Sequence, residues 1–201
     1  TPEANDDMKK DMKEFCTLLY GIDNEIEGIV VDTSIYTKQE NPKLEKTIFF
    51  GDDDYYNLFL KLLEDSGKSD INLLMGHYFF LGNEKIFNNH FSNVIDEEEY
   101  VETIKDSKYL LTASLQTALE SLACGNKPVL FKREDKIYDE NLIHELNLPV
   151  IEADSLKDLL EKFDASINEY PIISNFNIIN LENIKKEIKE KIDLYNKLTK
   201  Q

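Results

Sequence analysis

Residues 109–131 read YLLTASLQTALESLACGNKPVLF, and this stretch decides the fold class. Its first residues form a short apolar run of the kind that is buried on both faces of a parallel sheet. Small residues follow, and leucines then recur at helical spacing until Gly125 ends the pattern. A second apolar run at 129–131 comes directly afterwards. Strand, helix and strand in close succession predict a parallel βαβ unit.

The same alternation continues on both sides of this stretch. Further strands are expected at 47–50, 71–75, 93–95 and 150–151, and further helices at 54–65, 97–106, 138–146 and 156–163. Short strands that alternate with helices form a parallel sheet covered on both faces. The sequence therefore predicts a doubly wound, Rossmann-like α/β domain with a mostly parallel sheet of about six strands.

The flanking segments are expected to be appendages of this domain. Residues 4–20 carry the pattern of an amphipathic helix, residues 28–36 look extended, and a Lys- and Glu-rich helix is expected at 181–198. The predicted organisation has three parts: an N-terminal helix and linker (1–45), the Rossmann-like domain (46–165), and a C-terminal loop and helix (166–201) that packs on the domain or on a missing N-terminal half.

The charge of the chain excludes one large class of partner. Among 201 residues, 23 Lys and Arg stand against 40 Asp and Glu, a net charge of −17. Nucleic-acid binding depends on Lys and Arg at phosphates, so no nucleic-acid partner is expected. The apolar runs are too short to insert into a membrane, and the acidic start does not resemble a secretory signal. Two cysteines are too few for a disulfide framework, which makes the cytoplasm the expected location.

The start of the helix at 115–123 is a candidate phosphate site. Backbone N–H groups at Ser114, Leu115 and Gln116 belong to this helix start, where an anion is favoured. Glu120 lies about one turn further on the same face as Gln116, and its carboxylate can accept both hydroxyls of a ribose. The alternative is that Ser114 is only a helix cap and Glu120 a solvated residue.

The order of features around this helix resembles a known enzyme family. A small-residue turn, a helix with Glu120, Ala-Cys-Gly, Lys-Pro, a strand and a polar loop from Lys132 to Asn141 follow one another. This order is similar to the C-terminal half of GT-B-type nucleotide-sugar enzymes. It looks most like the UDP-sugar hydrolase of pseudaminic acid biosynthesis and its spore-coat polysaccharide relatives, and it also resembles the N-acetylglucosaminyltransferase of peptidoglycan synthesis. The resemblance covers roughly residues 46–163.

The resemblance implies a UDP-sugar ligand and a role for each matching residue. Ser114, Leu115 and Gln116 would contact the diphosphate and Glu120 the ribose, while Lys132 and Asn141 would face the diphosphate and the sugar. Gly51 and Asp52 would belong to the loop near the sugar, and Ile95 to the short strand whose backbone recognises uracil. No metal or cofactor is implied, because a helix start and basic side chains can stabilise a leaving diphosphate.

Two departures from the family pattern stand out. Asp52 replaces a second glycine and adds negative charge beside Asp53 and Asp54, where like charges cost on the order of 1 to 4 kcal/mol. This implies a differently held sugar or a lost nucleotide site. Nothing before Lys46 resembles the N-terminal Rossmann half that carries the catalytic His of the hydrolase. The chain is therefore expected to be the C-terminal half of a longer enzyme or one subunit of a split one.

The resemblance predicts a nucleotide-sugar-binding domain of a bacterial surface-glycan enzyme, a hydrolase or glycosyltransferase acting at the anomeric carbon. Catalytic residues are not predicted, since a water nucleophile would need a base from the other half. On its own the chain is expected to bind substrate without turnover.

Two other functions are open at this point. A phosphorelay receiver would use Asp52 and Asp53 for Mg²⁺ and Asp96 as phosphoacceptor, with Thr112 and Lys132 in support. A non-catalytic interaction module would use the apolar stripes of the terminal helices. The histidines, His77, His90 and His144, have no metal-ligand spacing; His77 is expected after a strand, His90 in a surface loop and His144 on a helix.

Overall fold

The computed structural model describes residues 29–64, 66–78, 82–173 and 178–179, together with positions 186, 189, 190, 192, 193 and 197. The helix predicted at 4–20 lies outside these residues. The helix predicted at 181–198 also lies outside them, apart from the isolated positions.

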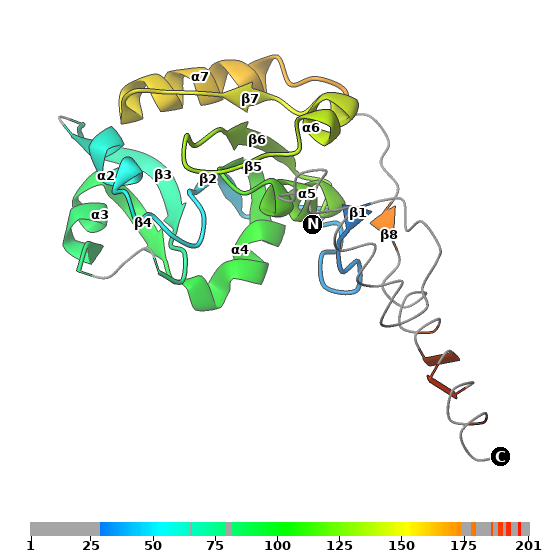
Figure 1. Ribbon diagram of the computed structural model, residues 1–201. Coiled ribbons are helices and arrows are strands. Elements are labelled where there is room, and N and C mark those ends of the chain that lie inside the picture. The colour runs from blue at the N-terminus through cyan, green and yellow to red at the C-terminus, as the bar shows by residue number, and fades with distance from the viewer. Residues whose placement is uncertain are drawn as a thin grey trace.

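A six-stranded parallel sheet forms the centre of the protein (Figure 1). Its strands are β2 (Leu44–Phe49), β3 (Ser69–Leu74), β4 (Phe91–Ile95), β5 (Ser107–Thr112), β6 (Lys127–Phe131) and β7 (Val150–Ile151). They lie in the order β4-β3-β2-β5-β6-β7, and every neighbouring pair is parallel. The predicted doubly wound α/β fold is therefore confirmed. The chain builds outward from β2 in one direction, and after β4 it returns to add β5 on the other side.

Helices cover both faces of this sheet. The helices α2 (Leu58–Leu63), α3 (Glu84–His90) and α7 (Leu156–Asn168) contribute to one apolar cluster, and α4 (Tyr100–Asp106), α5 (Leu115–Ala123) and α6 (Glu140–Leu146) contribute to the other. Side chains of one strand alternate between the two clusters, as Ile48 and Phe49 of β2 do. Because both faces are buried, the central strands read as continuous apolar runs.

The structure corrects several predicted boundaries. β2 begins at Leu44, three residues before the apolar run, because its first residues are only partly buried and need not be apolar. α2 begins at Leu58 instead of residue 54, since Asn57 adopts a left-handed conformation with φ of 54° and the Asp54 carboxylate caps the helix. A 3-10 turn, η1 (Glu97–Glu99), precedes α4 within the predicted helix at 97–106.

α3 is a helix that the sequence pattern did not predict. It has one buried residue, Phe87, so it shows no repeating apolar stripe. His90 is its last residue and not part of a surface loop, so that expectation was wrong. The His90 Nδ1 atom lies 3.0 Å from the Ser66 hydroxyl in a hydrogen bond that joins the end of α3 to the loop after α2.

A short pair of strands lies beside the main sheet, as Figure 1 shows. β1 (Ile29–Val30) pairs in parallel with β8 (Ile178–Ile179). The extended conformation predicted for 28–36 is limited to this strand, because a turn follows in which the N–H groups of Ile35 and Tyr36 donate to the Asp32 carbonyl. Val31 and Tyr36 are buried in the cluster formed by α4, α5 and α6.

Candidate functional site

The strand order places the topological switch point of the sheet at the carboxyl ends of β2 and β5. These neighbouring strands continue in opposite directions, since β2 leads to β3 and β5 leads to β6. In open α/β sheets a ligand-binding crevice is expected at such a switch point, and the carboxyl ends of these two strands are therefore the candidate crevice of this protein. Gly51 and Asp52 follow β2, and Ser114 follows β5, so the sequence-predicted residues from both strands meet this edge.

The loop after β2 is packed closely against the loop after β3. Gly51 has a φ of +122°, a backbone conformation that is strained for a residue with a side chain. A Cβ on Gly76 would lie 2.0 Å from the Gly51 carbonyl oxygen and 2.6 Å from the Asp52 Cα, so only glycine fits there. The N–H of Tyr78 donates to the Asp52 carbonyl at 2.8 Å. These contacts fix the backbone of the loop on one side.

The three consecutive acids in this loop have different surroundings. Asp52 is exposed. Asp53 lies 2.9 Å from the Lys136 ammonium and 3.4 Å from the Arg133 guanidinium. The Asp54 carboxylate accepts the N–H groups of Leu58 and Phe59 at the start of α2. Cations and a helix start therefore offset the repulsion expected for two of the three acids.

Arg133 fixes the same loop from the opposite side. Its fully buried guanidinium donates to the carbonyls of Asp53 at 2.6 Å and Phe50 at 3.3 Å, and to both carboxylate oxygens of Asp135 at 2.8 and 2.6 Å. Burial alone would lower the pKa of Arg133, but its hydrogen bonds and the charges of Asp135 and Asp53 raise it overall. The hydrogen bond from Arg133 in turn lowers the pKa of Asp135.

Tyr138 joins the ends of β5 and β6. Its hydroxyl donates to the Ala113 carbonyl at 3.0 Å and accepts from the backbone N–H of Arg133 at 3.0 Å. Burial raises the pKa of Tyr138, which keeps the phenol a donor. Arg133 and Tyr138 together tie the loops after β2, β5 and β6 into one unit.

α5 starts directly at the end of β5, as the sequence predicted. The Ser114 hydroxyl accepts the N–H of Thr117 at 3.2 Å, and the Ser114 N–H donates to the Thr112 hydroxyl at 3.1 Å. Leu115 is buried and Gln116 is half-buried in the first turn. Ser114 is therefore a helix cap, and because its hydroxyl is neutral the cap brings no negative charge to this helix end, unlike Asp54 at α2.

Glu120 of α5 lies in a network of hydroxyl and amide groups. Its Oε2 atom accepts from the Tyr100 hydroxyl at 2.7 Å, and its Oε1 atom accepts from Gln116 Nε2 at 3.2 Å. The shared face of Gln116 and Glu120 is confirmed by this contact. Burial, followed by the charge and hydrogen bonding of Glu120, raises the pKa of Tyr36. Glu120 is thus half-buried and held by its own chain, not a freely solvated residue.

Lys132 lines a groove, and Asn141 lies outside it. The groove has a volume of about 680 Å³ and lies between α2 and the segments that follow β6 and β7. Lys132, Lys136 and Tyr138 line it, and Lys132 forms a 2.6 Å ion pair with Glu140. Asn141 is exposed in the first turn of α6 and lies outside this lining. The groove is within the size range of ligand sites.

Ile95 is the last residue of β4, two strands away from β2. It is buried, and its carbonyl already accepts the Met75 N–H at 2.9 Å. Tyr100 follows it closely along the chain and reaches Glu120 on α5. The segment after β4 therefore comes next to α5, although β4 itself is at the edge of the sheet.

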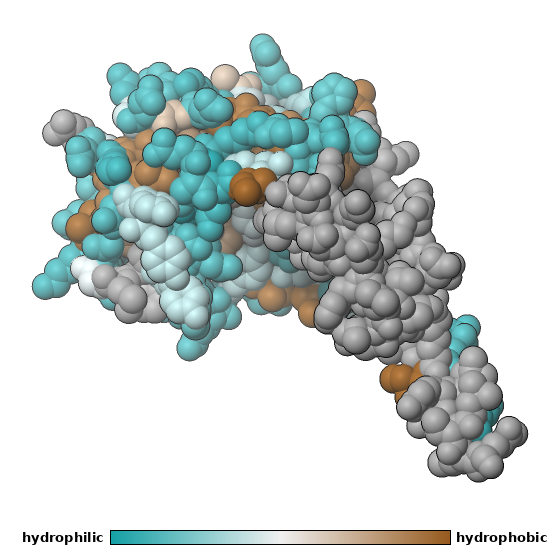
Figure 2. Space-filling model, in the orientation of Figure 1, coloured by the Kyte–Doolittle hydropathy of each residue, from teal (hydrophilic) through white to brown (hydrophobic). Residues whose placement is uncertain are grey.

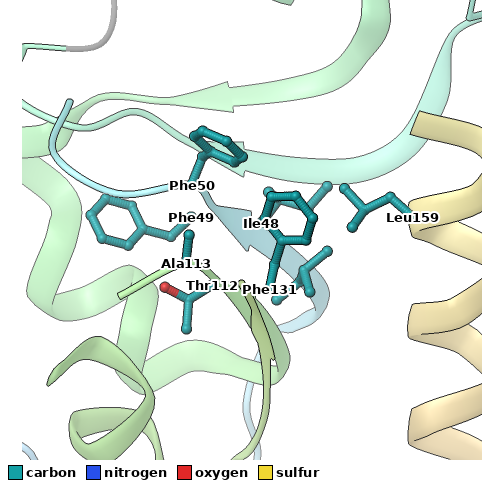
Figure 3. Close-up of a pocket in the computed structure, with 8 residues that line it drawn as sticks. Ile48, Phe49, Phe50, Thr112, Ala113, Phe131 and Leu159 are labelled. Carbon is teal, nitrogen blue, oxygen red and sulfur yellow. The ribbon is translucent and has the colours of Figure 1, made fainter. Parts of the chain in front are cut away.

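The face of the sheet under α7 is closed. Figure 3 shows Ile48 and Phe131 directed toward Leu159 of α7, with Phe49 on the other side of β2. The rings of Phe50 and Phe131 lie 5.5 Å apart between these residues. The space that remains has no room for a water molecule. A ligand at the crevice must therefore approach from the edge or from the side of α4 and α5.

The strand order contradicts the receiver alternative. Receiver-type sheets have the order 2-1-3-4-5, which sets the third strand beside the first. Here the corresponding strand, β4, is at the sheet edge, and β3 separates it from β2. Asp96 therefore does not follow a strand adjacent to that of Asp52. Among the residues described, no group of three or more His, Cys, Asp or Glu side chains could hold a metal ion.

Hydrophilic side chains cover much of the described surface, as the view in Figure 2 shows. His77 is exposed after β3, with its Nδ1 atom 3.8 Å from Glu97, and His144 is exposed on α6. In the part of the chain that the structure describes, no helix is long and apolar enough to span a membrane.

A search of solved structures found a match to a glycosyl transferase domain. It is the C-terminal domain of a group 1 family glycosyl transferase, LpcC, from Francisella tularensis. The two are 17% identical, the match covers 69% of this chain and 88% of that one, and the TM-score is 0.44. No protein-family model matches the chain, and a search of curated proteins found no match.

The sequence did not reveal the contacts that several residues of the site make. Tyr100 lies in the predicted helix at 97–106, but its hydroxyl contact with Glu120 has no local signature, because it joins residues of two different helices. Arg133 and Tyr138 lie in a polar loop where residue type alone does not reveal burial. A single arginine among charged residues after a buried strand was the available signal for Arg133.

Proposed function

We propose that this chain binds a UDP-sugar at the carboxyl edge of its sheet, as the nucleotide-binding half of an enzyme that acts at the anomeric carbon. The observation that carries the proposal is the strand order, which sets the topological switch point between β2 and β5, directly before the start of α5, the helix that carries Glu120. An all-parallel sheet of this order favours a small ligand at that crevice over a purely structural role.

In this proposal the diphosphate lies at the start of α5, near Ser114, Leu115 and Gln116. Two helices start beside the crevice, and the difference between their caps supports the choice. At α2, the Asp54 carboxylate already occupies the first N–H groups and would repel a phosphate. At α5, the cap is the neutral Ser114 hydroxyl, and the helix dipole there favours an anion.

The ribose is assigned to Glu120, and the base to the segment after β4. A carboxylate can accept about four hydrogen bonds, and Glu120 already has Tyr100, Gln116 and Tyr36 as donors, so one ribose hydroxyl takes the remaining position and the second takes the place of Tyr36. Because Tyr100 brings the segment after β4 next to Glu120, a base attached to that ribose would lie toward Ile95. The Ile95 carbonyl retains a second lone pair beside its bond to Met75.

The sugar is assigned to the side of Gly51 and the groove near Lys132. Lys132 and Lys136 line this groove and locally oppose the net charge of −17. Asp52 is exposed in the loop, where it can accept hydroxyls of the sugar. Asn141 would complete this side. Turnover would require a base from an N-terminal half, as the resemblance implies.

Thermal unfolding with UDP, UMP, CMP and GDP tests the proposal. UDP at 100 times its dissociation constant should stabilise the protein by about 2.7 kcal/mol. Glu120→Ala should abolish this stabilisation, and Glu145→Ala, which removes an exposed glutamate of α6, should keep it. No stabilisation of the folded wild type by any of these nucleotides would refute nucleotide binding and leave an interaction module as the alternative.

A further inference from the structure

Tyr100 connects two segments that are distant in sequence. Its hydroxyl lies 2.7 Å from Oε2 of Glu120 and 2.8 Å from the Thr117 hydroxyl, both on α5. Its ring packs edge-on against Phe49 at the end of β2, with centroids 5.1 Å apart. The phenol is therefore held by the sheet on one side and by α5 on the other.

The Tyr100 hydroxyl donates one hydrogen bond and accepts another. The phenol has a single hydrogen, and this hydrogen is donated to Glu120. Thr117 must then donate its own hydrogen to the Tyr100 oxygen. Burial and the charge of Glu120 raise the pKa of Tyr100, so the phenol stays a donor at neutral pH. Thr117, Tyr100 and Glu120 thus form an ordered chain.

This chain fixes one oxygen of the carboxylate more firmly than the other. The bond from Tyr100 to Oε2 is 2.7 Å long, whereas the bond from Gln116 to Oε1 is 3.2 Å. A bond from a phenol to a carboxylate is of the strong, charge-assisted type. The plane of the carboxylate is therefore determined chiefly by Tyr100, and its remaining lone pairs keep a fixed direction.

We infer that Tyr100 is a positioning residue that makes the site selective for ribose over 2′-deoxyribose. The inference rests on the proposed nucleotide site at Glu120. A fixed carboxylate can accept both hydroxyls of a vicinal diol, and a deoxyribose offers one hydroxyl fewer. Without the Tyr100 hydroxyl the carboxylate turns to follow whichever hydroxyl is present, and the advantage of the diol decreases.

Calorimetric titration of UDP and 2′-deoxy-UDP tests this inference with three proteins. They are the wild type, Tyr100→Phe and Tyr109→Phe, a matched loss of one phenol from β5. A hydrogen bond to a charged group corresponds to a preference of about tenfold, so the wild type should bind UDP about ten times more tightly than 2′-deoxy-UDP. In Tyr100→Phe this ratio should fall to about twofold, mainly through weaker UDP binding, and Tyr109→Phe should keep the wild-type ratio.

Thr117→Val is a second variant that tests the same inference. It removes the hydroxyl that donates to Tyr100 without changing Tyr100 itself. We expect an intermediate ratio, and this variant retains the test should Tyr100→Phe not fold.

The outcomes separate the inference from the proposal on which it rests. Equal weakening of both nucleotides in Tyr100→Phe, or an unchanged ratio, would overturn the positioning role while leaving nucleotide binding in place. A folded wild type that binds neither nucleotide would overturn the proposed function and the inference together.

Discussion

Replacing Arg133 by methionine should destabilise the protein far more than a surface charge would suggest. The Arg133 side chain is 0% exposed, and its partners Asp53 and Asp135 are only 21% and 11% exposed. Methionine keeps much of the aliphatic volume but removes all the side-chain N–H donors. Two carboxylates and two backbone carbonyls would then lose a partner at the carboxyl edge.

The expected cost follows from these contacts. Removing one partner of a buried ion pair costs about 3 to 5 kcal/mol. Both carboxylates lie close enough to the surface to regain some water, which places the loss near the lower limit, at about 3 kcal/mol. With a urea slope of about 2 kcal/mol per molar, the unfolding midpoint should fall by about 1.5 M.

Urea unfolding followed by circular dichroism measures this difference, with Lys132→Met as the matched control. Lys132 is the neighbouring cation, but its ion pair with Glu140 is 26% and 64% exposed, so its loss should cost less than about 1 kcal/mol. Because Arg133 lowers the pKa of Asp135, the stability from this pair is present above the ordinary carboxyl pKa of about 3.9 and is lost as the pH falls further. Similar losses in the two variants at pH 7 would refute the proposed role of Arg133.

Three further predictions concern the loops, the buried phenols and Tyr36. Gly76→Ala should lower the free energy of unfolding by about 3 kcal/mol or more, since its Cβ would lie 2.0 Å from the Gly51 carbonyl oxygen. Gly67→Ala is the control: a Cβ there meets nothing within 4 Å, so its stability should stay within about 0.5 kcal/mol of wild type in the same urea assay. Burial raises the pKa of four phenols, those of Tyr36, Tyr100, Tyr138 and Tyr170. These phenols should therefore ionise only as the fold is lost above pH 10, and the stability of the protein should fall there. Titration at 295 nm during alkaline unfolding checks this, and early, fully reversible ionisation of all tyrosines would contradict it. Tyr36→Phe should cost about 1 kcal/mol of stability, because one donor to Glu120 is removed. The freed acceptor position on Glu120 should tighten UDP binding about threefold. Weaker binding in calorimetry would contradict this and show that Tyr36 assists the ligand.

The alternation of apolar runs was sufficient to predict the sheet. Residues such as Leu110 and Val129 lie in strands buried on both faces, and burial of that kind leaves a continuous apolar run in the sequence. Elements with few buried residues escaped prediction. α3 has Phe87 alone as a buried residue, and β8 consists of two residues, so neither gives a repeating pattern of apolar residues in the sequence.

The candidate site was predicted only in part, for a related reason. Ser114 and Glu120 are close in sequence, and helix geometry alone brings Gln116 and Glu120 together. Contacts between distant segments, such as Tyr100 with Glu120 and Arg133 with Asp53, depend on the strand order. The sequence also does not reveal that Lys136 pairs with Asp53 and that the start of α2 donates to Asp54, contacts that oppose the repulsion expected among the three acids.

The central claim, that a nucleoside diphosphate binds at the crevice between β2 and β5, is tested most directly by amide chemical-shift mapping with UDP. Shifts should concentrate at Gly51, at residues 114–120 and at Tyr100, and amides at the opposite, amino end of the strands, such as those of Ser69 and Lys108, should not move. Saturable shifts at the carboxyl edge that disappear in Glu120→Ala are the predicted result. Shifts confined to other parts of the protein, or no shifts at all, would contradict the account.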